Sequence, residues 1–194
     1  MRLKEGYIYH VFNQGNNKRR VFFCDNNYVY FLEKARKHIL PYASIIAYCL
    51  MPNHFHFMIY IHRLNIDTVS RSKRLISRSL NSSIGTMLSS YSQGLNKQRN
   101  NSGSVFRPKT KAIAVNDYES RFDGLKSLMR GIYDHVPEWQ YPEVCFNYIH
   151  LNPVRSNLVS RPHEWFFSSA RAYHFHDPDP LVDKHLAKEF INWK

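Results

Sequence analysis

Two histidines stand two residues apart in the segment His54-Phe55-His56. Aromatic and β-branched residues fill the segment 54–61 and predict a β-strand, on which residues two apart point to the same face. Two neutral imidazoles side by side suit a divalent metal ion. The pattern is short, and two half-buried histidines bonded to their neighbours would also produce it. No CxxC pair or HExxH helix accompanies it, which disfavours a zinc hydrolase.

Tyr148 and Asn152 form a second candidate pair, four positions apart in a predicted short helix over 143–152. Residues with this spacing are neighbours on one helix face. A tyrosine hydroxyl, with an ordinary pKa near 10, is a weak nucleophile unless its target is polarised or its proton removed. A metal ion on a target phosphate would polarise it, and the Asn152 amide oxygen could complete the ligand set. His10 and His150 are candidates for moving the proton, while a purely structural role stays open for each residue.

The charge distribution points to a polyanionic partner. The 194 residues include 27 Lys and Arg against 15 Asp and Glu, a net charge of +12. Residues 61–111 include ten basic residues and one acidic residue, Asp67. This quarter of the chain therefore carries nine of the twelve net positive charges. Such an excess favours nucleic acid, and secondly an anionic membrane surface. The candidate DNA-binding residues within it are Arg71, Lys73, Arg74, Arg78, Arg107, Lys109 and Lys111.

Composition excludes several other classes of protein. The hydrophobic fraction of 43% supports a folded core and argues against a wholly disordered basic protein. No apolar run approaches the roughly 18 residues of a membrane span, and no apolar stretch follows the N-terminus as in a signal peptide. The three cysteines are far apart and give no disulfide framework. We therefore expect a soluble cytoplasmic protein with no membrane partner.

The remaining patterns predict the elements that position these residues. Apolar and aromatic runs predict strands, and three-and-four spacing of apolar residues predicts helices. A turn at Pro52-Asn53 should pair its two flanking strands antiparallel, and Pro153 should end or redirect the short helix. The order of elements predicts an α+β fold, with helices packed on an antiparallel sheet. The expected strands span 7–14, 43–51, 54–61 and 105–115, and the longer helices 25–39, 68–97 and 117–140; a basic turn spans 15–20.

Four ordered blocks of the sequence resemble one known family. The segment Leu50-Met51-Pro52-Asn53-His54-Phe55-His56 resembles the HUH motif, in which U is a bulky apolar residue. Tyr148-Ile149-His150-Leu151-Asn152-Pro153-Val154-Arg155 resembles the YIxxNPVR block of the REP-associated tyrosine transposases, single-tyrosine HUH transposases of the insertion-sequence-200-like type. Residues 9–16 resemble the opening strand of that family and residues 168–173 its closing SSxRxY segment. The resemblance covers residues 6–175.

This resemblance implies a fold, a reaction and a set of roles. The fold would be an RRM/ferredoxin-like antiparallel sheet with helices packed on it. His54, His56 and Asn152 would bind Mg²⁺ or Mn²⁺, and Tyr148 would be the nucleophile. The family cuts hairpin-forming single-stranded DNA, leaves a 5′-phosphotyrosine and a free 3′-hydroxyl, and rejoins the strand in transposition or palindromic repeat processing. The resemblance also implies a nucleoid-associated protein, either a homodimer or a monomer.

The sequence departs from the family pattern at two places. Gln14 stands where the family usually has arginine. The stretch around 118–141 is longer than the usual link to the tyrosine helix and is predicted to be an insertion. We expect one domain over 1–175, with a C-terminal tail over 176–194 packed on it.

Two other functions stay open at this point. A domesticated relative could bind hairpin DNA sequence-specifically and cut nothing. A metal-dependent phosphodiesterase that uses water would release cut DNA with no protein attached. The joint presence of both histidines, the tyrosine and the asparagine favours the transposase.

Overall fold

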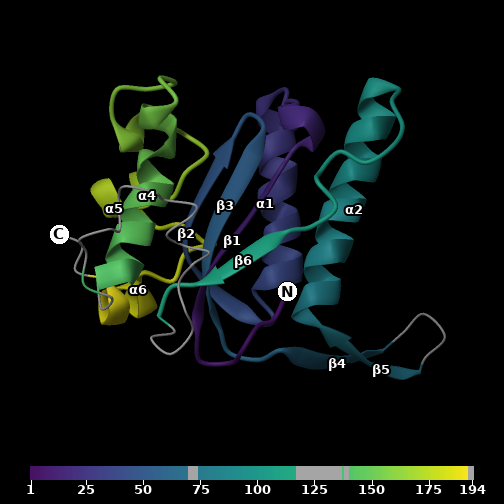
Figure 1. Cartoon of the computed structure of the whole chain (residues 1–194), viewed down its shortest axis with the longest axis horizontal. Helices are drawn as coiled ribbons and strands as arrows, with labels where there is room; N and C mark the ends of the chain where they lie inside the picture. The colour runs from purple at the N-terminus through teal and green to yellow at the C-terminus, as the bar shows by residue number, and fades with distance from the viewer. Residues whose placement is uncertain (70–73, 117–136, 138–139, 192–194) are drawn as a thin grey trace.

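The computed structural model of the chain describes residues 1–69, 74–116, 137 and 140–191. Four strands form one antiparallel sheet in the order β2-β3-β1-β6, and helices cover both of its faces (Figure 1). This arrangement confirms the predicted α+β fold. The strands are β1 (Ile8–Gln14), β2 (Ala43–Met51), β3 (His54–Ile61) and β6 (Lys111–Ala114).

The two strands flanking Pro52-Asn53 pair antiparallel as predicted. Leu50 faces Phe55 across the pair, and Met51 faces His54 beside the turn. Most residues of β2 and β3 are buried, because helices lie against both sides of these strands. Burial on both faces also explains why their sequences are nearly continuous in apolar residues rather than alternating.

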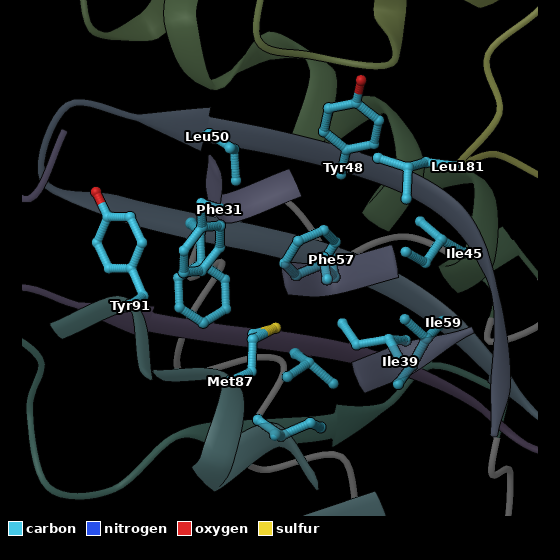
Figure 2. Close-up of a cluster of buried hydrophobic side chains, with 14 of the residues drawn as sticks. Phe31, Ile39, Ile45, Tyr48, Leu50, Phe57, Ile59, Met87, Tyr91 and Leu181 are labelled. Carbon is cyan, nitrogen blue, oxygen red and sulfur yellow. The ribbon is translucent and has the colours of Figure 1, made fainter. Parts of the chain in front are cut away.

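One face of the sheet carries the larger core. Helices α1 (Asp25–Ile39) and α2 (Leu80–Arg99) lie against it, and Figure 2 shows their side chains among those of the strands. Phe31 of α1 is fully buried, with its ring centroid 5.0 Å from that of Tyr91 on α2 and 6.3 Å from that of Phe57 on β3. Burying such a ring stabilises the fold by about 3 kcal/mol, so this cluster holds the helices on the sheet.

The opposite face is covered by the C-terminal third of the described chain. Ile149 is fully buried there, and the Tyr173 hydroxyl donates a hydrogen bond of 2.6 Å to the Ile46 carbonyl of β2. Ala187 is also fully buried, so the segment after residue 175 contributes to this second core. The helices on this face are α4 (Tyr141–Arg155), α5 (Ala170–His174) and α6 (Lys184–Phe190).

The predicted helix over 68–97 is wrong at its N-terminal end. Residues 65–69 and 75–79 instead form two paired antiparallel strands, and the helix begins only at Leu80. Ser79 marks this start because its hydroxyl accepts a hydrogen bond from the Ser82 backbone N–H, as an N-cap does. Leu75 fits the three-and-four apolar spacing that suggested a helix here, yet its side chain is 71% exposed. The hairpin strands are β4 (Asn65–Val69) and β5 (Leu75–Ser79).

Two prolines act differently from the sequence expectation. Pro153 lies inside α4, which continues to Arg155 although Pro153 has no N–H to donate to the Ile149 carbonyl one turn earlier. The predicted strand 105–115 contains Pro108 and pairs as a regular strand only from Lys111. Before it, Phe106 forms an isolated bridge with Gly15.

The predicted helix over 117–140 and the predicted insertion around 118–141 lie almost wholly outside the described residues. Within the part of the chain that the structure describes, no helix is both long and apolar enough to cross a membrane.

Candidate nucleophile and metal site

The register of β1 on β3 brings the rings of four residues to one face of the sheet: His10, Phe12, His54 and His56. Gln14 pairs with His54, and Phe12 with His56. The rings of His54 and His56 are 4.9 Å apart between centroids, and the ring of His10 is 5.0 Å from that of His56. The two histidines predicted to share a face therefore do so, with His10 beside them.

Helix α4 places Tyr148 over this histidine cluster. The Tyr148 ring centroid lies 5.7 Å from that of His56 and 6.0 Å from that of His10. Asn152, one turn further along, donates a hydrogen bond of 2.9 Å from its amide to the Tyr148 carbonyl. The Asn152 side chain also lies beside those of His54 and Tyr148. The predicted ligands and nucleophile thus meet at one point, although they are almost a hundred residues apart in sequence.

A cavity of about 220 Å³ opens at this point, and basic side chains reach it. Three of the predicted DNA-binding residues line it beside the tyrosine and the histidines. None of its described lining residues is acidic, so the cavity favours an anion. The lining consists of Phe12, Asn13, Gln14, His54, His56, Arg107, Lys109, Lys111 and Tyr148.

The other predicted DNA-binding residues do not line this cavity. Arg78 belongs to β5, where its backbone carbonyl accepts a hydrogen bond of 3.1 Å from the Tyr42 hydroxyl, and Arg74 directly precedes that strand. Both lie at a hairpin, because the segment that carries them is not helical. Arg71 and Lys73 lie outside the described residues. The described members of the predicted DNA-binding set therefore lie in two places, at the cavity and at the paired strands β4 and β5.

Burial keeps the three histidines neutral. It lowers the pKa of His10 to about 3 and that of His54 to about 4, the latter partly offset by the hydrogen bond to Asn152. Burial lowers the pKa of His56 well below its usual value, and the neighbouring His10 and His54 lower it further. Neutral imidazoles offer a lone pair, which is the form that binds metal ions.

The hydrogen bonds around Asn53 indicate which nitrogen of His54 is free of a proton. The Asn53 amide nitrogen donates to the Lys18 carbonyl at 3.1 Å, so its oxygen is the atom 2.6 Å from His54 Nδ1. A carbonyl oxygen only accepts, and His54 Nδ1 must therefore donate. In the neutral ring this leaves the Nε2 atom of His54 as the one with a lone pair.

His56 has a ring nitrogen with no partner. Its Nδ1 atom lies 2.8 Å from His10 Nε2, while its Nε2 atom and His10 Nδ1 are buried without hydrogen bonds among the described residues. A buried imidazole nitrogen with no hydrogen-bond partner on a cavity wall fits the role of a metal ligand. Among the described residues, no three His, Cys, Asp or Glu side chains are placed to hold one metal ion together, so a third ligand beside His54 and His56 would need another side chain, such as Asn152.

The Tyr148 side chain is half-buried, and its hydroxyl stays protonated at neutral pH. Burial raises its pKa, while the hydrogen bond to Asn152 and the charge of Arg155 lower it. The Arg155 guanidinium carbon lies 5.4 Å from the centre of the Tyr148 ring. The Arg155 guanidinium and the Asn152 amide are therefore placed to stabilise a phenolate that develops on Tyr148.

Sequence reasoning missed two lining residues of the cavity, Phe12 and Asn13. The signal for Phe12 was present in the alternation His10, Phe12, Gln14, which places all three on one face of a strand. Gln14, where the resembling family has arginine, lies in the cavity wall. The pairing of β1 with both β3 and β6, which assembles the wall, could not be read from local pattern.

No family model and no curated protein matches the sequence. Among solved structures, the chain is similar to that of a REP-associated tyrosine transposase bound to a REP hairpin, with a TM-score of 0.52 and 12% sequence identity. The match covers 94% of this chain and 88% of the other. The likeness shows a shared fold.

Proposed function

We propose that this protein is a metal-dependent tyrosine DNA nickase and strand transferase of the REP-associated tyrosine transposase type. The observation that carries the proposal is the position of Tyr148 over His54 and His56 in a cavity with cationic walls. The solved structure with a similar fold was determined with a REP hairpin, and the four sequence blocks support the same family. The proposed substrate is single-stranded DNA flanking a hairpin.

The cavity walls would hold the scissile phosphate. Arg107, Lys109 and Lys111 offer three cations along one side, and no described acid on the wall competes for them. The Phe12 ring lies below the Lys111 ammonium, 5.8 Å from its nitrogen, and presents an aromatic face on which a base could stack. The DNA would thus lie along β6, with its backbone directed toward Tyr148.

Tyr148 would then attack the phosphorus in line with the 3′-oxygen. A bond forms between the phenol oxygen and phosphorus, the bond to the 3′-oxygen breaks, and the phenol proton leaves with solvent or the departing oxygen. Arg155 and Asn152 favour the phenolate during this attack. The phosphotyrosine preserves the energy of the phosphodiester bond, so a second 3′-hydroxyl can reverse the step and rejoin the strand.

His54, His56 and Asn152 would hold the divalent ion. When bound, the ion supplies positive charge that polarises the phosphate and offsets its developing charge. Two neutral imidazoles and an amide leave the full dipositive charge in place. This set with two nitrogen ligands fits Mn²⁺ better than Mg²⁺, which prefers oxygen ligands.

One gel experiment separates this function from its two alternatives. The protein is incubated with end-labelled hairpin DNA carrying single-stranded flanks and Mn²⁺, then denatured. The proposal predicts a labelled band shifted by the mass of the chain. Free cut DNA would indicate a water-using phosphodiesterase, and uncut DNA a binding protein without catalysis; either result would contradict the proposal.

A further inference from the structure

A second basic cavity lies outside the tyrosine site, between the turn that follows β1 and the C-terminal end of α2. Its volume is about 510 Å³, and three exposed arginines line it. None of the described residues in its wall is acidic. We call it the arginine groove; its lining is Arg19, Arg20, Phe23, Leu95, Asn96, Arg99, Asn101, Ser102, Ser104 and Val105.

The arginines of the groove are held by uncharged partners. The Arg99 guanidinium stacks on the Phe23 ring, with its carbon 3.7 Å from the ring centre. The Arg20 Nε atom donates to the Phe22 carbonyl at 2.6 Å, and Arg19 donates weakly to the Asn16 carbonyl at 3.4 Å. Within the described chain no carboxylate forms an ion pair with these three groups. Their charge is therefore available to an anion.

The turn that presents Arg19 is rigidly shaped. Gly15 begins it, and a Cβ atom there would come within 2.2 Å of the Arg19 carbonyl oxygen, so no larger residue fits. Asn17 and Lys18 both adopt left-handed backbone angles, with φ of 54° and 59°, which non-glycine residues rarely do. Such strain persists only where surrounding contacts impose it, and it clusters at binding sites.

Hydrogen bonds fix this turn to its surroundings, beginning with that of the Gly15 N–H to the Asn53 carbonyl at 2.8 Å. The Asn16 side chain donates to the Ser104 carbonyl at 2.9 Å, and the Asn16 backbone N–H to the Val105 carbonyl at 3.0 Å. Another is the hydrogen bond from Asn53 to Lys18. Both walls of the groove are therefore joined before any ligand binds. Binding would then lose little conformational entropy of the backbone.

The groove is joined to the tyrosine cavity by the same residues. Asn53 bonds Lys18 through its nitrogen and His54 through its oxygen, so one side chain joins the turn that carries Arg19 to a histidine of the tyrosine cavity. Arg107, which lines the tyrosine cavity, follows Val105 of the groove by two residues, and its N–H bonds the Gln14 carbonyl at 2.9 Å. The arginine groove and the tyrosine cavity are thus built on neighbouring segments that hydrogen-bond to one another.

We propose that the arginine groove is a second phosphate-binding site, which holds the backbone of the DNA away from the cut. The inference rests on the proposed function, since it assigns the groove to the same substrate. Guanidinium groups match phosphate geometry, and the Asn and Ser side chains beside them add neutral donors without selecting a base. The bound backbone is that of the hairpin stem or of the single-stranded flank, which share this chemistry.

The test uses the full chain with the double substitution Arg19→Ala and Arg99→Ala. Arg20 is kept, because its bond to Phe22 supports the fold. The matched control is Arg36→Ala with Lys37→Ala, which removes two exposed cations about three helical turns from the start of α1. The melting temperature of each variant verifies folding, and Arg19→Gln with Arg99→Gln replaces the alanine pair if that pair unfolds.

Affinity is measured against salt for two probes, a blunt mixed-sequence hairpin and a mixed-sequence single strand of about 16 nucleotides. Each lost phosphate contact should flatten the slope of log affinity against log salt by about 0.9 for duplex and about 0.7 for single strand. We expect the groove variant to lose about two contacts with one probe, which identifies the source of the backbone, and the control to match wild type. Unchanged slopes for both probes would overturn the groove site.

The experiments give different results if the groove proposal is wrong and if the proposed tyrosine reaction is wrong. Adduct formation is measured in parallel, in wild type and in the groove variant, on a short single strand that has few phosphates beyond the scissile one. A wild-type chain that forms no adduct, yet whose salt slope falls in the groove variant, would contradict the proposed function and support the groove. Adducts with equal salt slopes in wild type and variant would support the function and contradict the groove.

Discussion

The Nε2 atom of His10 lies 2.8 Å from the Nδ1 atom of His56, and both rings are buried. One of these nitrogens must carry the shared proton. If His56 donates it, the Nε2 atom of His56 keeps a bare lone pair on the cavity wall; if His10 donates it, that atom is protonated and cannot bind a metal ion. A metal site at His56 therefore requires His10 to act as the acceptor.

The first prediction concerns this acceptor. Replacing His10 by leucine leaves His56 without the group that selects its tautomer, and should lower Mn²⁺ affinity about 10- to 100-fold. His10→Gln retains a carbonyl acceptor and should restore part of the affinity. Titration calorimetry of the DNA-free protein measures both values.

A direct readout of the same relationship comes from nitrogen NMR of the metal-free protein. The spectrum distinguishes protonated from bare imidazole nitrogens, and should show His56 protonated at Nδ1. Protonation at Nε2, together with unchanged Mn²⁺ affinity in His10→Leu, would contradict this role.

The second prediction concerns the cations of the cavity wall. Arg107→Ala with Lys109→Ala removes two charges that face the proposed DNA track, and should flatten the salt dependence of single-strand binding by about 1.4. Adduct formation should fall as well, because the scissile phosphate is less firmly held. Arg36→Ala with Lys37→Ala is the matched control, and an equal effect of both pairs would argue against a localised track.

The third prediction concerns stability in acid. His150 is buried against Ser169, with its Nε2 atom 2.8 Å from the hydroxyl, and burial lowers its pKa from 6.5 to about 3. The unfolded chain therefore takes up a proton below pH 6.5 that the folded chain refuses until pH 3. Stability should fall across this window by about 1.4 kcal/mol per pH unit for each such histidine.

His150→Gln keeps a hydrogen-bonding group beside Ser169 and removes this titration. Urea unfolding of the metal-free variant should show a loss of stability between neutral pH and about pH 4.5 that is smaller than that of wild type by about 2.7 kcal/mol. An identical loss in the two proteins would show that His150 is accessible to protons in the fold.

The sequence predicts correctly those parts of the fold that depend on contacts between residues close in sequence. Continuous apolar residues mark β2 and β3, and the turn at Pro52 fixes their register, so His54 and His56 could be assigned to one face. Tyr148 and Asn152 are neighbours by helical spacing alone. Both results follow from contacts close in sequence.

The rest depends on contacts distant in sequence or on competing local signals. Leu75 and Ile76 match a helical stripe, yet the N-cap at Ser79 starts the helix after them and they become part of a hairpin. The cavity wall needs Asn13 to bond Thr110, 97 residues away. The arginine groove likewise joins residues 19 and 99, and a pattern of charges cannot predict that meeting.

The most direct test of the proposed reaction is the chemistry of Tyr148 itself. Wild-type protein, incubated with hairpin DNA carrying single-stranded flanks and Mn²⁺, should yield a protease-stable peptide containing Tyr148 bonded to a 5′-phosphate, detected by mass spectrometry. Tyr148→Phe removes only the hydroxyl and should abolish the adduct while binding the same DNA with nearly unchanged affinity. Adducts that persist in Tyr148→Phe, or a wild-type adduct mapped to another residue, would contradict the assignment.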